Sequence, residues 1–112
     1  MPVFSIYAHE VLVGYSNLEF GDPPMGVAFG IFRPTPGYST IRSECISNRA
    51  DQAHLALTVR TEGQTVLTCA GVGIMDCDDG PGSIEVNVLG ISCPAYETLF
   101  PEHVAAYERQ WT

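Results

Sequence analysis

The chain has 112 residues, a formal net charge of −8 and an apolar content of 46%. This length and composition are typical of one folded domain, because the chain can bury a core without disulfide or metal staples. The charge disfavours binding to nucleic acid or to an anionic membrane, since both need a basic patch. We therefore predict a single domain over residues 1–112 that binds neither nucleic acid nor membrane.

Charge is distributed unevenly along the chain. Residues 1–32 carry three carboxylates and no basic residue, whereas residues 33–60 carry four of the five arginines. The 48 residues between Arg60 and Arg109 hold eight carboxylates and no positive charge. Such a segregated chain projects a negative field that attracts a basic partner and repels phosphates.

The residue types present and the amino-terminal sequence limit the possible chemistry and cellular location of the protein. The sequence contains no lysine, which excludes Schiff-base lysines, a P-loop lysine and a lysine general base. Its first residues lack the basic and long apolar regions of a signal peptide, and no apolar run approaches the length of a membrane span. We expect a cytoplasmic protein with reduced cysteines and without a cofactor.

The first half of the chain predicts strands and one short helix. Two segments rich in Val, Ile and Tyr, and a third in which large residues alternate with Gly and Ala, predict strands over residues 3–7, 10–15 and 25–32. The prolines after Asp22 predict a turn. Residues 33–37 are expected to form a loop, and residues 38–47 a short helix.

In the second half, three strands are expected to form a meander. Alternating apolar residues predict strands over residues 55–60, 65–75 and 84–91. Glu62-Gly63 suits a hairpin turn between the first two, and the turn-rich residues 76–83 suit a loop between the last two. Adjacent strands with short connections pair in sequence order.

The chain is expected to close with a helix that begins at Pro101, preceded by a helical turn over residues 95–99. Val104, Tyr107 and Trp111 recur at helical spacing and predict a packing stripe. The fold class that follows is α+β: mainly an antiparallel sheet of about five or six strands, with the C-terminal helix packed on one face.

Neither a metal site nor a catalytic centre is predicted. The loop Asp76-Cys77-Asp78-Asp79-Gly80 starts like a calcium loop, but the required glycine and glutamate are replaced by Pro81 and Asn87. The four cysteines lack the close spacing of zinc ligands. The three histidines are dispersed, and no residue is assigned a catalytic role.

Glycines on two strands suggest a cleft. Gly26 and Gly30 lie on one side of one predicted strand, and Gly71 and Gly73 lie on one side of another. Glycine in a strand costs stability unless the backbone is approached closely. A small-molecule or enzymatic site over these strands would be lined by the polar and aromatic residues His9, Tyr15, Phe32, Tyr38 and His103.

The function that the sequence favours is a non-catalytic acidic domain that binds a basic protein surface, as an inhibitor or immunity-type protein does. Size and acidity are shared with small bacterial proteins of that kind, which is a similarity of composition. The complementary charge would come from Glu19, Asp22, Asp76, Asp78 and Asp79. We expect the last three to be exposed, so that neutralising them leaves stability unchanged or slightly higher. The alternatives are a homo-oligomeric structural subunit and a domain that uses the glycine-faced cleft.

Overall fold

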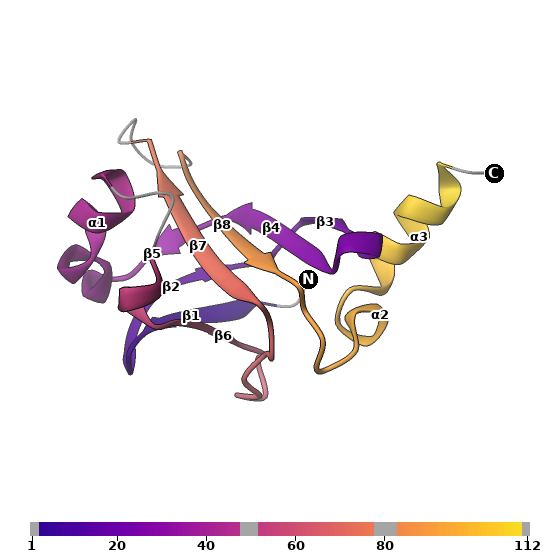
Figure 1. Cartoon of the computed structure of the whole chain (residues 1–112), viewed down its shortest axis with the longest axis horizontal. Helices are drawn as coiled ribbons and strands as arrows, with labels where there is room; N and C mark the ends of the chain where they lie inside the picture. Colours follow the sequence, from indigo (N-terminus) through magenta and orange to yellow (C-terminus); the bar gives the residue numbers. More distant parts are fainter. Residues whose placement is uncertain (1–2, 48–51, 78–82, 111–112) are drawn as a thin grey trace.

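The computed structural model describes residues 3–47, 52–77 and 83–110 (Figure 1). Its strands are β1 Phe4–Ala8, β2 Val11–Ser16, β3 Phe20–Asp22, β4 Val27–Ile31, β5 Arg33–Pro34, β6 Leu57–Arg60, β7 Gly71–Asp76 and β8 Ile84–Leu89. Its helices are α1 Arg42–Ser47, α2 Tyr96–Leu99 and α3 Pro101–Arg109, with 3-10 turns at Pro23–Met25, Pro36–Thr40 and Ala53–Leu55.

The strands form two antiparallel sheets. The first sheet has the order β5-β2-β1-β6, and the second has the order β3-β4-β8-β7. The predicted α+β class, with antiparallel pairing and a C-terminal helix, is confirmed. The strand count is higher than expected, because eight described strands are shared between two sheets of four.

The core lies between the two sheets, which cross one another in Figure 1. One continuous cluster of buried side chains joins Ile6 and Val13 of the first sheet to Ile74 and Val86 of the second. The chain passes between the sheets after β2, where Leu18 adopts a positive φ and donates its N–H to Ser16 Oγ at 3.0 Å. Among the described residues, no helix is long and apolar enough to cross a membrane.

The predicted meander is correct for the pairing of its last two strands, although β7 begins only at Gly71, and it is correct for the first strand only at one antiparallel bridge, Arg60 to Val66. β7 pairs with β8 along its whole length, but β6 pairs with β1 in the other sheet. The hairpin after β6 is short: Leu67 N–H donates to the Val59 carbonyl at 2.9 Å, and Thr68 N–H then bonds to the Cys93 carbonyl at 2.6 Å. That second bond directs the chain into the second sheet.

Two shorter predictions need correction. Part of the loop expected over residues 33–37 forms β5 against β2, and the rest begins a 3-10 turn. The helix expected over residues 38–47 starts only at Arg42, because the residues before it belong to that turn. The helical turn before the C-terminal helix, and that helix, occupy the expected residues. The expectation that the helix packs on one face of a single sheet is wrong: α3 contacts the edge strand β3 and the Pro23–Met25 turn, and it extends beyond the two sheets in Figure 1.

A glutamine side chain takes the place of a neighbouring strand at the edge of β7. Gln52 is buried, and its Nε2 donates to the Ile74 carbonyl at 2.7 Å. The Ile74 N–H donates in return to Gln52 Oε1, also at 2.7 Å. One carboxamide therefore satisfies both the N–H and the C=O of Ile74.

Replacing Gln52 by alanine is expected to destabilise the fold by about 2 kcal/mol, because two buried backbone groups lose their partners. Urea denaturation would measure the loss. The matched control is Gln110→Ala, the same substitution at an exposed position, which should change the free energy of unfolding by less than about 0.5 kcal/mol. Equal values for the two variants would show that water replaces the carboxamide without cost.

Candidate functional site

The second sheet has one side in the core and one side open. Along β8, Ile84, Val86 and Val88 are buried, while Glu85 and Leu89 between and after them are exposed. The strand register carries this alternation across the sheet, so that Phe20, Phe29, Asn87 and Gly73 form one outward row. We call this side the open face; its residues are Phe20, Asp22, Val27, Phe29, Ile31, Gly71, Gly73, Met75, Glu85, Asn87 and Leu89.

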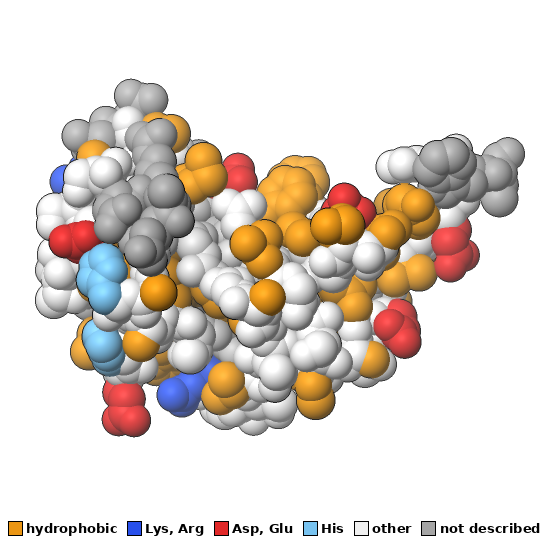
Figure 2. Space-filling model, in the orientation of Figure 1, with side chains coloured by type: hydrophobic (Ala, Val, Ile, Leu, Met, Phe, Trp, Pro, Cys, Tyr) orange, Lys and Arg blue, Asp and Glu red, His pale blue; other side chains and the backbone are white. Residues whose placement is uncertain are grey.

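Large apolar side chains dominate the open face. Phe20, Ile31, Met75 and Leu89 are between 40% and 55% exposed, and Phe20 stacks on Phe29 with 5.5 Å between ring centroids. Figure 2 shows hydrophobic side chains gathered along the upper side of the view, between the α1 end and α3. Several large apolar side chains that stay exposed on one face of a folded chain are typical of an interaction surface.

The charge of the open face is entirely negative. The four strands β3, β4, β7 and β8 contain no arginine, lysine or histidine, whereas Asp22 and Glu85 are exposed on this side. In the view of Figure 2, the basic side chains lie at the left end and along the bottom, away from the apolar patch. Both features of the surface therefore favour a partner that is apolar and basic.

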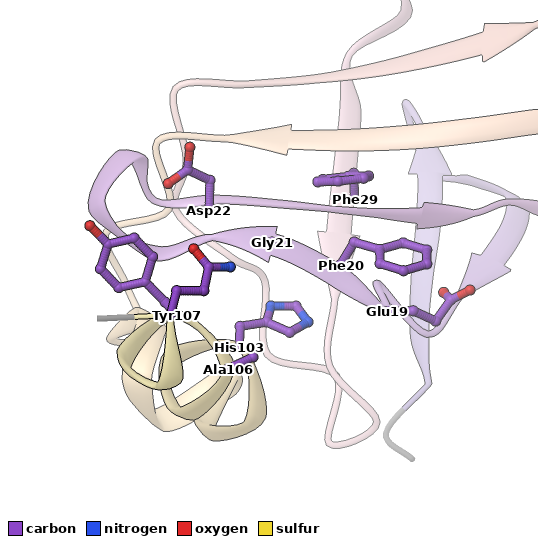
Figure 3. Close-up of a pocket in the computed structure, with 9 residues that line it drawn as sticks. Glu19, Phe20, Gly21, Asp22, Phe29, His103, Ala106 and Tyr107 are labelled. Atoms are coloured by element: carbon purple, nitrogen blue, oxygen red, sulfur yellow. The ribbon is translucent and has the colours of Figure 1, made fainter. Parts of the chain in front are cut away.

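A pocket of about 540 Å³ lies at one end of the open face, between α3 and the β3–β4 hairpin (Figure 3). One side of the pocket is formed by residues that share one face of the C-terminal helix, at positions i, i+3, i+4 and i+7 counted from His103. The other side is formed by β3, β4 and Glu19, the residue before β3. Its lining consists of Glu19, Phe20, Gly21, Asp22, Phe29, His103, Ala106, Tyr107 and Gln110.

A hydrogen-bonded pair holds this end of the molecule together. The Tyr96 hydroxyl donates to the Val27 carbonyl at 2.7 Å and lies 3.0 Å from His103 Nδ1. Burial, with the nearby charge of Asp22, raises the pKa of Tyr96 to about 12, so the hydroxyl keeps its proton at neutral pH. Since Tyr96 has only that proton to give, His103 Nδ1 must be the donor in their contact.

This arrangement fixes the chemistry of the second nitrogen of His103. When Nδ1 carries the hydrogen, Nε2 of the neutral ring is an acceptor. No hydrogen bond joins Nε2 to another described residue. The ring itself is held parallel to Phe100, with 4.7 Å between centroids. A neutral His103 ring therefore has Nε2 as an acceptor, and the contacts with Tyr96 and Phe100 hold the orientation of the ring beside the pocket that it lines.

Gly21 makes this close approach feasible. A Cβ at this position would overlap the Tyr96 hydroxyl and His103 Nδ1, and it would lie 3.0 Å from the Val27 carbonyl oxygen. Figure 3 shows Gly21 on the strand directly beside the His103 ring. The absence of a side chain is thus what lets α2 and α3 dock on the β3–β4 hairpin.

Glu19 contributes a carboxylate with an unsatisfied oxygen. Its Oε1 is buried and has no hydrogen-bond partner among the described residues. This atom lies over Gly30, where any Cβ would overlap it. No described ion pair neutralises Glu19 or Asp22. The pocket therefore has two carboxylates without a described ion pair in its lining, while the unsatisfied Glu19 oxygen itself faces Gly30 on the inner side of the sheet.

The structure brings together three of the residues singled out from the sequence: Glu19, Asp22 and His103 line one pocket. Asp76 does not join them. The expectation that Asp76 lies exposed in a loop is wrong, since it is the last residue of β7 and only 1% exposed. Alternation along β7 turns its side chain inward. Asp78 and Asp79 lie outside the described residues.

Asp76 instead belongs to a buried polar cluster. Its Oδ2 accepts a hydrogen bond from the Tyr38 hydroxyl at 2.9 Å and lies 3.6 Å from Arg42 Nε. Burial raises the pKa of Tyr38 well above its usual value, and the bond to Asp76 raises it further. This carboxylate is therefore a structural acceptor and is not available to a partner.

The predicted glycine-faced cleft is not formed. Phe32 and Tyr38 are buried in the core with their rings 5.2 Å apart, so they cannot line a cleft. Tyr15 is exposed on β2 of the first sheet, and His9 lies in the β1–β2 turn, which leaves His103 as the one pocket residue of this set.

The glycines divide between several roles. Gly26 ends a 3-10 turn with φ +66° instead of lying on a strand, and Gly30 faces Glu19 on the inner side of the sheet. Gly71 and Gly73 lie on the open face, where a Cβ would meet nothing closer than 3.8 Å. These two positions leave the β7 side of the face bare.

Nothing in the sequence marks Phe20, Phe29 and Tyr107 as site residues. Alternation places Phe29 on the large-residue side of its strand, but it does not tell which side is the core. Tyr107 was expected to pack inward with Val104 and Trp111. Val104 does pack against the core, whereas Tyr107 lines the pocket and Trp111 lies outside the described residues.

Within residues 3–47, 52–77 and 83–110, no group of three or more His, Cys, Asp or Glu side chains is placed to hold a metal ion. Comparison of the chain with protein-family models, with curated proteins and with solved structures finds no match. Any functional conclusion therefore depends on the open face and its pocket alone.

Proposed function

We propose that the chain is a non-catalytic protein-binding domain whose open face docks on a basic surface of another protein, in the manner of an inhibitor or immunity-type protein. The observation that carries the proposal is the composition of that face. Large apolar side chains are 40–55% exposed on it, and the strands that build it contain acidic residues and no basic one.

The two properties would have separate roles in binding. Burial of the apolar side chains supplies affinity, at about 25 cal/mol per Å² removed from water. The carboxylates Asp22 and Glu85, added to a net charge of −8, steer a basic partner and speed association. The bare stretch at Gly71 and Gly73 gives the backbone of a partner room to approach.

Self-association through the same face is the weaker proposal. A second copy would bring its own Asp22 and Glu85 against the first, and each chain carries a net charge of −8. Like charges across an interface oppose association. Small-molecule binding is a second candidate, supported by one observation: the pocket volume of about 540 Å³ falls within the range of about 300–1,000 Å³ that is usual for ligand sites.

The open face can be tested with a substitution that adds bulk without disturbing the fold. Gly71→Arg places a long cation where a Cβ has nothing within 4 Å. A partner would be captured from cells of the source organism and purified, and its affinity measured for both chains. We expect the variant to bind on the order of 100-fold more weakly, with wild-type association slowing as salt is raised.

The matched control is Val66→Arg, the same new side chain at an exposed apolar position outside the open face. It should bind the partner as wild type does. Equal affinity of Gly71→Arg and wild type, or a captured partner without a basic surface, would refute the proposal. Sedimentation of the purified chain, without a partner, tests self-association. A wild-type dimer that becomes a monomer in Gly71→Arg would establish self-association through the open face instead.

A further inference from the structure

We propose that the pocket between α3 and the β3–β4 hairpin receives the guanidinium group of one arginine side chain of the partner. This inference rests on the proposed function and makes it specific, because it names the group that anchors the partner. It depends on three properties of the pocket: its acceptors, its aromatic surface and the absence of a described ion pair to the carboxylates of Glu19 and Asp22.

Three groups of the pocket lining can accept hydrogen bonds. The ionised carboxylates of Glu19 and Asp22 only accept, and the Tyr96–His103 contact leaves Nε2 as the acceptor of a neutral His103 ring. Glu19 Oε1 is buried against Gly30 on the inner side of the sheet. The carboxylate of Glu19 therefore acts on the pocket through its negative charge.

The acceptors lie around an aromatic surface. Figure 3 shows Asp22 and Glu19 at opposite ends of the pocket, with the rings of Phe20, Phe29 and His103 between them. Phe20 and Phe29 stack 5.5 Å apart, and Phe20 is 55% exposed. A flat cation laid on such a ring gains cation–π attraction while its N–H groups point outward in its own plane.

Guanidinium fits these features better than the other cations of proteins. It is planar, stacks on aromatic rings and carries five N–H donors in a plane, which can reach acceptors on more than one side. An ammonium group is compact and strongly hydrated, and it offers no flat surface. An anionic ligand is disfavoured by the carboxylates of Glu19 and Asp22, since neither forms an ion pair with another described residue.

The test uses a single amino-acid derivative as the probe. N-acetyl-L-arginine amide carries the guanidinium on an uncharged backbone, and N-acetyl-L-citrulline amide has the same shape with a neutral urea. We expect the arginine derivative to shift the NMR signals of Phe20, Phe29 and His103 in a saturable way, with a dissociation constant on the order of millimolar. The citrulline derivative should bind at least about tenfold more weakly, because it lacks the charge.

Variants assign the binding to the pocket. Glu19→Gln keeps the size of the side chain but removes its charge, and we expect it to weaken binding of the arginine probe by about tenfold. Phe20→Leu should weaken it by about fivefold through loss of the aromatic surface. Glu85→Gln is the matched control, since it removes one carboxylate of the open face that does not line the pocket. It should bind the probe as wild type does.

Equal binding of the arginine and citrulline probes, or equal weakening by Glu19→Gln and Glu85→Gln, would overturn the inference. So would shifts located away from the pocket. These outcomes leave the proposed function open to its own test, because partner binding that is sensitive to Gly71→Arg does not depend on an arginine anchor. A pocket that binds the probe while the open face binds no partner would refute the proposed function alone.

Discussion

Replacing Asp76 by alanine is expected to destabilise the protein by about 3 kcal/mol. Asp76 is 1% exposed and accepts the hydroxyl of Tyr38 at 2.9 Å. Removing the carboxylate leaves that buried hydroxyl without its acceptor and opens a small void where β7 ends. Arg42 loses a partner too, but half of its side chain is exposed, so water can solvate it at little cost.

Denaturation by urea at neutral pH measures this loss. Tyr38→Phe is the informative control, since it removes the donor and leaves the carboxylate beside Arg42. It should cost about 1 kcal/mol, the usual net value of one hydrogen bond. If Asp76→Ala proved as stable as wild type, Asp76 would have to be exposed in solution, and the inward direction of its side chain would be wrong.

Replacing Gly21 by alanine is expected to cost about 2–3 kcal/mol, from one methyl group. The added Cβ would overlap the Tyr96 hydroxyl and His103 Nδ1. Either the two side chains move, which breaks the bond from Tyr96 to the Val27 carbonyl, or the helices shift away from β3. Both outcomes leave buried polar atoms without partners and change the shape of the pocket.

Thermal unfolding would measure the loss of stability in Gly21→Ala, and the NMR signals of His103 would report the change in the pocket. The control is Gly63→Ala, an identical substitution where the nearest atom to the new Cβ is 3.8 Å away. It should leave both readings close to wild type. Should Gly21→Ala unfold like the control and keep the His103 signals, the docking of α2 and α3 on this hairpin would be looser than the distances indicate.

The sequence was sufficient for the elements of the second sheet but not for its orientation. Alternation correctly separated the large residues of β4, such as Phe29 and Ile31, from Ala28 and Gly30. It could not tell that the small residues face the core and the large ones face outward. Which side faces the core depends on a long-range contact: the backbone at Leu18 and Glu19 crosses over Gly30 and leaves no room for a side chain there.

Long-range partners account for the other errors. Alternation along residues 65–75 does not indicate which strand lies beside them: only Val66 bridges to β6, at Arg60, and β6 otherwise pairs with β1. Asp76 was grouped with the acids that follow it, because no local signal marks the Tyr38 hydroxyl as its partner. The pocket itself joins residues 19–29 to residues 103–110, and a single sequence contains no record of that contact.

The carboxamide of Gln52 also determines how this protein can meet other chains. An edge strand with unpaired N–H and C=O groups invites another strand to add to the sheet, which is the route to uncontrolled polymerisation. At Ile74, in the middle of β7, both groups are already occupied. An incoming strand would first have to displace a buried side chain, so growth of the sheet through β7 is blocked at its centre. The second sheet is thereby left to interact through its face and not through this edge.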